Sequence, residues 1–218
     1  MKKIAIILSG CGYLDGAEIQ ESVLTLLAID RAGASASCFA PDMLQYHVVN
    51  HLTGEVSGNE QRNVLVESAR IVRGAIADVA LLDTGQFDAL ILPGGYGAAK
   101  NLSTFAFDGS SCTILPDVTK AVEAFHQAGK PIGFICIAPV IAAKVLGQFD
   151  IDVTIGNEAE TAAAIEELGA HHRECPVWNC VVSSREKIVS TPAYMLGPSV
   201  SEVAKGIDQL VHTVLTLC

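Results

Sequence analysis

Basic residues are scarce in this sequence, and their scarcity limits the partners it can have. Only 14 of the 218 residues are lysine or arginine, against 24 aspartate and glutamate, which gives a net charge of −10. Charged residues make up 17% of the chain and hydrophobic residues 50%, so much of the chain must be buried in a core. Nucleic-acid binders present clustered cations to phosphates, and the charge balance therefore argues against nucleic acid as a partner.

Long hydrophobic runs are also missing. The start, Met1-Lys2-Lys3 before the apolar residues 4–8, imitates a signal peptide, but Ser9 and a glycine follow directly. That apolar run is too short for the core of a secretory leader, and no other run reaches the ~18 residues that a membrane helix needs. We therefore expect a soluble chain without a leader or a membrane segment.

The cysteines give no pattern of disulfides or metal ligands. There are seven, an odd number at irregular spacing, which favours reduced thiols in a cytoplasmic protein. Cys175 and Cys180 are separated by four residues and have no second ligand pair, so we interpret them as loop thiols and expect no metal. The glycines of residues 10–16 miss the dinucleotide-binding spacing, and no phosphate-binding loop is present, so we expect no cofactor.

Short apolar runs alternate with segments of helical period along most of the chain. Strands are predicted at residues 4–8, 35–40, 89–92, 131–136 and 153–155, with a late pair at 181–182 and 188–189. Helices are predicted at residues 17–32, 63–73, 115–128, 137–146, 158–168 and 199–217. Residues 41–60 suggest an excursion with a small hairpin, and residues 101–114 a surface segment without either period.

This alternation predicts an α/β fold. Parallel strands joined by helical crossovers need a mostly parallel sheet with helices on both faces, which is a three-layer sandwich. The chain contains no repeat, low-complexity tract or linker, so we expect residues 1–218 to form a single domain.

A site in such a sheet forms at the carboxyl ends of the strands, and three turns follow strands here. They are residues 10–12, residues 94–97 and the pair Cys136-Ile137. Cys136 stands where a strand passes directly into a helix, which predicts an exposed sulfur near the free N–H groups of the helix start. Those groups favour a thiolate that is more acidic than a free thiol. The alternative is a small buried hydrophobic residue.

Three further residues could assist Cys136. The N–H groups of Gly95 and Ile137 could form an oxyanion hole, although residues 93–95 could also be an ordinary strand-ending turn. The first helix carries Ile19, Val23, Leu26 and Leu27 at helical spacing, and Glu21 lies in phase with Ala17, Leu24 and Ala28. A carboxyl group on such an apolar face is expected to have a raised pKa, unless it turns to solvent.

Histidine is poorly placed to serve this cysteine. His126 precedes the strand that leads to Cys136 and is expected ~20 Å away, too far to pair with it. His172 and Glu174 have the His-x-Glu spacing of an amidotransferase, but His172 enters at the wrong end of a strand.

The sequence resembles the ThiJ/PfpI superfamily, and within it the branch called enhancing lycopene biosynthesis protein. The likeness covers nearly the whole chain. It is carried by residues 7–12, 16–21, 92–102, 134–139 and 191–196. The resemblance implies a flavodoxin-like, class I amidotransferase fold and a homodimer. It also places the family nucleophile on Cys136, its carboxyl partner on Glu21 and its oxyanion donors on Gly95 and Ile137.

One departure from the family affects the function. Many members have a histidine shortly after the helix of the nucleophile, whereas residues 154–158 contain none. The expected function is therefore a cofactor-free glyoxalase that converts small dicarbonyls such as glyoxal to glycolate, with apparent deglycase activity through the same adduct. The alternatives are a redox-sensing or regulatory stress protein without turnover, and a glutaminase-like subunit.

Overall fold

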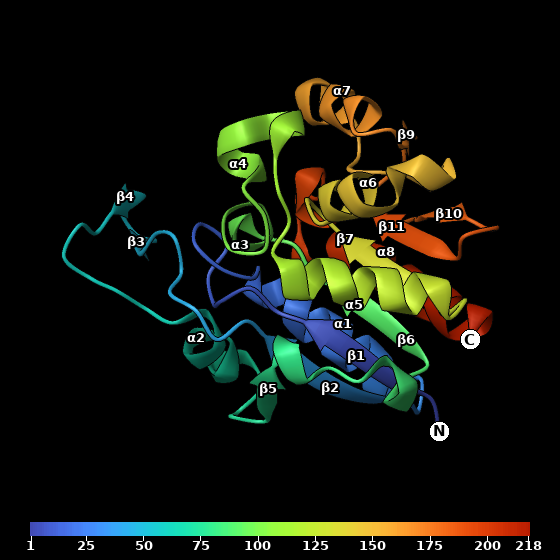
Figure 1. The fold of residues 1–218 in the computed structure, drawn as a ribbon, viewed down its shortest axis with the longest axis horizontal. Coiled ribbons are helices and arrows are strands. Elements are labelled where there is room, and N and C mark those ends of the chain that lie inside the picture. Colours follow the sequence, from blue (N-terminus) through green and yellow to red (C-terminus); the bar gives the residue numbers. More distant parts are fainter.

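The computed structural model of residues 1–218 is built around a seven-stranded sheet (Figure 1). The strand order is β10-β11-β7-β6-β1-β2-β5, and only β10 and β11 pair antiparallel. The strands are β1 (Lys3–Ile7), β2 (Ser35–Ala40), β5 (Ile76–Asp78), β6 (Ala89–Leu92), β7 (Ile132–Ile135), β10 (Val181–Ser183) and β11 (Ile188–Thr191). The predicted α/β fold with a mostly parallel sheet is confirmed.

Helices cover both faces of this sheet because its strands are buried on both sides. In β1, Ile4 and Ile6 belong to one hydrophobic cluster, and Ala5 and Ile7 belong to the other. The first cluster is closed by α1 (Ile19–Arg31), α2 (Val64–Ile71) and α8 (Val200–Leu217). The second is closed by α5 (Pro116–Gln127) and α6 (Pro139–Leu146). None of the helices is both long and apolar enough to cross a membrane.

Two small sheets lie outside the central one. The hairpin expected in residues 41–60 is present as β3 (Val49–Asn50) and β4 (Glu55–Val56), and it projects from the body of the molecule (Figure 1). The strand expected at residues 153–155 is β8 (Asp152–Val153), which pairs with β9 (His171–His172) rather than joining the central sheet. Between β8 and β9 the chain forms α7 (Ala159–Glu167).

The segment after β6 is more regular than the sequence predicts. It forms two short helices, α3 (Tyr96–Lys100) and α4 (Phe105–Asp108). Residues 105–108 are exposed or half-buried, as a surface segment at 101–114 would be, but the sequence does not predict their helix. Helices this short show no helical period in sequence. Single 3-10 turns occur at Val79–Leu81, Thr84–Gln86, Gly109–Ser111, Gly147–Phe149 and Ala193–Met195.

Four neighbouring parallel strands end at the same edge of the sheet. These strands are β1, β6, β7 and β11, and the order of the sheet places them side by side. The segments that follow them, beginning at residues 8, 93, 136 and 192, therefore come together, and they build the candidate site.

Candidate active site

Cys136 occupies a strained turn directly after β7. Its φ is +62°, a left-handed conformation that a residue with a side chain rarely adopts. The N–H of Cys136 donates to the carbonyl of Thr191 at 2.9 Å, which holds the turn against the end of β11. The α6 helix begins at Pro139 rather than at Ile137 as predicted. Cys136 is 7% exposed, so the expected exposed sulfur is nearly buried.

Glu21 lies completely buried beside this turn, with an exposed fraction of 0%. Its Oε2 accepts a hydrogen bond from the N–H of Gly94 at 2.9 Å, and its Oε1 accepts one from the N–H of Tyr194 at 3.3 Å. The carboxyl group and the Cys136 side chain both lie against Gly94, close enough for each to shift the pKa of the other. Burial, and to a lesser degree the charge of Glu18, raises the pKa of Glu21 to about 8.

Close contacts require glycine after β6. A Cβ atom on Gly94 would lie 2.4 Å from the Cβ of Cys136 and 2.8 Å from Oε2 of Glu21. Gly95 has a φ of +91°, and a Cβ atom there would lie 2.4 Å from the backbone nitrogen of Glu18. These glycines let β6 approach both α1 and the cysteine turn, which an ordinary strand-ending turn does not require.

The N–H groups of Gly95 and Ile137 lie near enough to the sulfur of Cys136 to lower its pKa. The structure thus brings together all four residues that the sequence analysis selects. It does not give the predicted acidity, because burial and then the Glu21 carboxylate raise the pKa of Cys136 above that of a free thiol, more than the two N–H groups lower it. Protonation of Glu21 removes that repulsion, so Cys136 and Glu21 titrate as a coupled pair.

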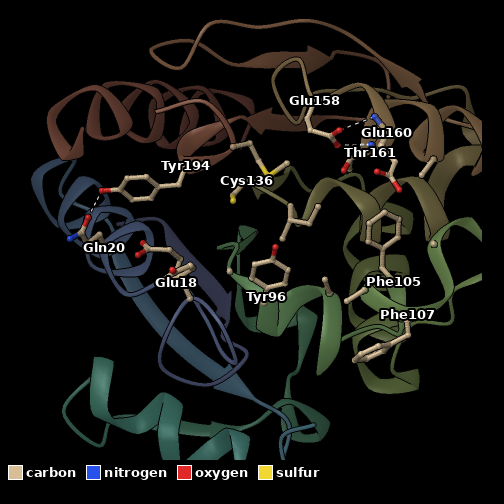
Figure 2. Close-up of a pocket in the computed structure, with 18 residues that line it drawn as sticks. Glu18, Gln20, Tyr96, Phe105, Phe107, Cys136, Glu158, Glu160, Thr161 and Tyr194 are labelled. Atoms are coloured by element: carbon tan, nitrogen blue, oxygen red, sulfur yellow. Dashed lines mark hydrogen bonds between the residues drawn. The ribbon is translucent and has the colours of Figure 1, made fainter. Parts of the chain in front are cut away.

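A cavity of about 1060 Å³ opens above Cys136 (Figure 2). Its size is at the upper end of the range for small-molecule sites. No histidine, lysine or arginine lines it. The lining residues are Tyr13, Glu18, Gln20, Gly95, Tyr96, Ala99, Phe105, Ala106, Phe107, Gly109, Cys136, Ile137, Glu158, Glu160, Thr161, Ala164, Tyr194 and Met195.

Much of this lining is missed by sequence reasoning. Tyr194 supplies a backbone N–H to Glu21, and its hydroxyl group donates to the side-chain oxygen of Gln20. The only signal for Tyr194 is its position in residues 191–196, which carry the family resemblance. The aromatic and acidic walls come from α3, α4 and α7, and no motif in the sequence indicates that these helices surround Cys136.

The other residues considered in the sequence lie outside the cavity. The Nε2 atom of His172 accepts a hydrogen bond from the N–H of Ile155 at 3.4 Å, and His126 pairs with Glu186 at 2.6 Å. The thiols of Cys175 and Cys180 are free. No group of three or more histidine, cysteine or acidic side chains is arranged to hold a metal ion.

No protein-family model matches the chain, but several proteins resemble it closely. The human glutamine amidotransferase-like class 1 domain-containing protein 3, mitochondrial, is 48% identical, and the match covers 99% of this chain and 83% of that protein. The rat ES1 protein homolog, mitochondrial, is 46% identical, with coverage of 99% and 84%.

Solved structures agree with this relationship. An isoprenoid biosynthesis protein with an amidotransferase-like domain from Ehrlichia chaffeensis has a TM-score of 0.93 and 39% identity, covering 100% of this chain and 99% of that one. A ThiJ/PfpI domain protein from Brachyspira murdochii shares the fold, with a TM-score of 0.61 and 17% identity, covering 99% and 98%. The chain therefore belongs to the class I glutamine amidotransferase-like proteins, and it shares the fold of a ThiJ/PfpI domain protein.

Proposed function

We propose that this protein is a cofactor-independent glyoxalase that converts glyoxal to glycolate. One observation carries the proposal: the fully buried Glu21 carboxyl group lies beside Cys136, which lines a cavity without histidine, and each of the two groups shifts the pKa of the other. A cysteine and a buried carboxyl group are enough to add a thiolate to an aldehyde and to move a proton between two carbons.

The first step is addition to one aldehyde group. The pair has lost one proton, that of Glu21, and the Glu21 carboxylate takes the thiol proton of Cys136 as the substrate binds, which leaves a thiolate beside a protonated Glu21. The sulfur forms a bond to the carbonyl carbon, and the negative charge moves to the carbonyl oxygen. The N–H groups of Gly95 and Ile137 stabilise this oxyanion, which then takes the proton of Glu21. The product is a hemithioacetal beside a carboxylate.

The second step is an internal redox exchange between the two carbons. The Glu21 carboxylate removes the proton from the carbon bonded to sulfur, which gives an enediolate. Glu21 then returns this proton to the neighbouring carbon, while the hydroxyl proton passes to the second oxygen. One carbon is thereby oxidised to a thioester and the other is reduced to an alcohol. Water hydrolyses the thioester, releasing glycolate and restoring the pair.

The test follows glyoxal loss and glycolate formation in the purified protein. Cys136→Ala removes the nucleophile and Glu21→Gln removes the proton carrier, and each is expected to lower kcat/KM by about 100-fold or more. Cys180→Ala is the matched control, because Cys180 is a free thiol outside the cavity, and its activity should be unchanged. Full activity in either site variant would overturn the mechanism.

The two alternative functions receive less support from the geometry. A glutaminase of the Cys/His type needs an imidazole near the nucleophile, and no histidine lines the cavity. A redox sensor needs an accessible, acidic thiol, whereas Cys136 is 7% exposed and its pKa is raised. Apparent deglycase activity is compatible with the proposal because it uses the same hemithioacetal.

The cellular location also belongs to the proposal. All seven cysteines are free in the structure, which supports the reducing, cytoplasmic environment expected from the sequence. The human and rat relatives are named as mitochondrial proteins. Fractionation of the source cells, with the protein followed by immunoblot, tests the cytoplasmic location.

A further inference from the structure

We propose that the cavity above Cys136 selects against negatively charged compounds and admits uncharged or cationic carbonyl substrates. The statement that these compounds are substrates rests on the proposed function. Selection by charge at Cys136 does not depend on that function.

The charged residues that line the cavity all carry carboxyl groups. They are Glu18 on one side and Glu158 and Glu160 on the other (Figure 2). At the floor, the coupled pair of Cys136 and Glu21 adds a further negative charge when it loses a proton. An anion that approaches the sulfur therefore meets like charges and no lining cation.

The start of α7 would normally attract an anion, but here it is already occupied. The free N–H groups at a helix start bind carboxylates and phosphates. Glu158 takes this role itself, because its two oxygens accept from the N–H of Glu160 at 2.9 Å and from the N–H of Thr161 at 2.7 Å. The polar groups of Thr161, its side chain first and then its N–H, together with the N–H of Glu160, lower the pKa of Glu158 and keep it ionised.

A lysine on a helix that lines the cavity is directed elsewhere. Lys100 belongs to α3, whose Tyr96 lines the cavity, but its ammonium group donates to the carbonyl of Leu14 at 3.1 Å. The same group lies 4.8 Å from the centre of the Tyr96 ring. Lys100 is thus engaged by other groups and does not face the cavity, so it cannot act as the counterion of a substrate carboxylate.

The rest of the cavity wall suits an uncharged, apolar part of a substrate. Tyr96, Phe105 and Phe107 present aromatic rings along one side, and Ile137 and Met195 add apolar surface. Glyoxal fills only a small part of about 1060 Å³. A carbonyl compound with an apolar or aromatic substituent would contact this wall, whereas the same compound with a carboxylate would lie close to Glu158 and Glu160.

Alkylation of Cys136 tests the selection without any turnover. Iodoacetamide and iodoacetate have similar size and react alike, as the thiolate displaces iodide and forms a carbon–sulfur bond, but only iodoacetate is negatively charged. Both rates are measured at Cys136 by peptide mass spectrometry and divided by the rates with glutathione. We expect the normalised preference for iodoacetamide to be about tenfold or more, because the lining carboxylates and the negative charge of the deprotonated pair repel iodoacetate.

Variants identify the source of this preference. Glu158→Gln with Glu160→Gln should lower the preference at least threefold, because the α7 start then lacks its resident charge. Glu167→Gln is the matched control, since it removes a charge from the same helix outside the cavity. Equal normalised rates for the two reagents, an unchanged preference in the double variant, or no alkylation of Cys136 by either reagent would overturn the inference.

Measurements of turnover distinguish a failure of charge selection from a failure of the proposed function. Phenylglyoxal and 4-carboxyphenylglyoxal differ only by the carboxylate, and the first should have the higher kcat/KM. If glyoxal is not converted but the alkylation preference holds, the proposed function fails and charge selection stands. If glyoxal is converted and both phenylglyoxals react equally well, glyoxalase activity stands and charge selection fails.

Discussion

In α1 the distribution of polar and apolar side chains between the buried and the exposed face is the reverse of that in most surface helices. On the side packed against the sheet and α8, the buried residues include a carboxyl and two hydroxyl side chains. On the outer side, three aliphatic residues are 38–46% exposed. The buried polar residues are Glu21, Ser22 and Thr25, and the exposed aliphatic ones are Ile19, Val23 and Leu27.

The buried polar residues differ in where their hydrogen-bond partners lie. The hydroxyl group of Ser22 donates to the carbonyl of Glu18, and that of Thr25 donates to the carbonyl of Glu21, both at 2.7 Å. These bonds stay within the helix. Glu21 instead accepts from the segments after β6 and β11, so its burial serves the site. We conclude that α1 is placed against the sheet partly to present Glu21, at a cost in stability.

Replacing Glu21 is expected to have the largest effect on the difference between the two faces of α1. Glu21 has a pKa of about 8 in the folded protein, against 4.5 for an ordinary glutamate. Between these values the folded state holds a proton that the unfolded state has released, so stability is full below the lower value and falls as the pH rises toward the upper one. The slope approaches about 1.4 kcal/mol per pH unit.

Glu21→Gln removes this dependence. The variant should gain stability relative to the unchanged protein as the pH rises from about 5 to 8, while glyoxal turnover is lost. Urea denaturation at several pH values gives both free energies of unfolding, and Glu167→Gln serves as the control with no such change. A stability difference that stays constant over this range would contradict the raised pKa.

The position of Glu21 shows what sequence can and cannot predict. The order of strands and helices gives the turns that surround Cys136, and the phase of the helix separates Glu21 from Glu18. The same phase also shows an aliphatic stripe at Ile19 and Val23, which would usually face the core. Which stripe is buried depends on α8, a helix that begins only at Val200 and packs against α1.

Other features of the site depend on contacts that no local pattern encodes. The positive φ of Cys136 is imposed by its place between β7 and the end of β11. Its burial beside a carboxyl group reverses the acidity expected from the helix start alone. The cavity walls come from α3 and α4, which are five and four residues long and too short to show a period.

A substitution with a smaller expected effect tests whether the buried hydroxyl groups have hydrogen-bond partners only within α1. Thr25 is 0% exposed and its hydroxyl bonds only to its own helix, so Thr25→Val should change the free energy of unfolding by no more than about 1 kcal/mol. Glyoxal turnover should be kept, because Glu21 retains its N–H donors. Thr25→Ser is the companion variant that keeps the hydroxyl group and loses the methyl group. A loss above about 2 kcal/mol with valine would show that the hydroxyl group has a partner beyond the helix.

The smallest effect is expected on the outer face. Val23 is 46% exposed, so Val23→Ser should change the free energy of unfolding of the isolated chain by less than about 0.5 kcal/mol. Sedimentation velocity on both proteins, with urea denaturation at two protein concentrations, checks this. A larger, concentration-dependent loss would mean that a second copy covers the stripe, as the homodimer expected from the family resemblance would allow. In that case the aliphatic residues of α1 would be buried after all, and the contrast between its faces would belong to the single chain only.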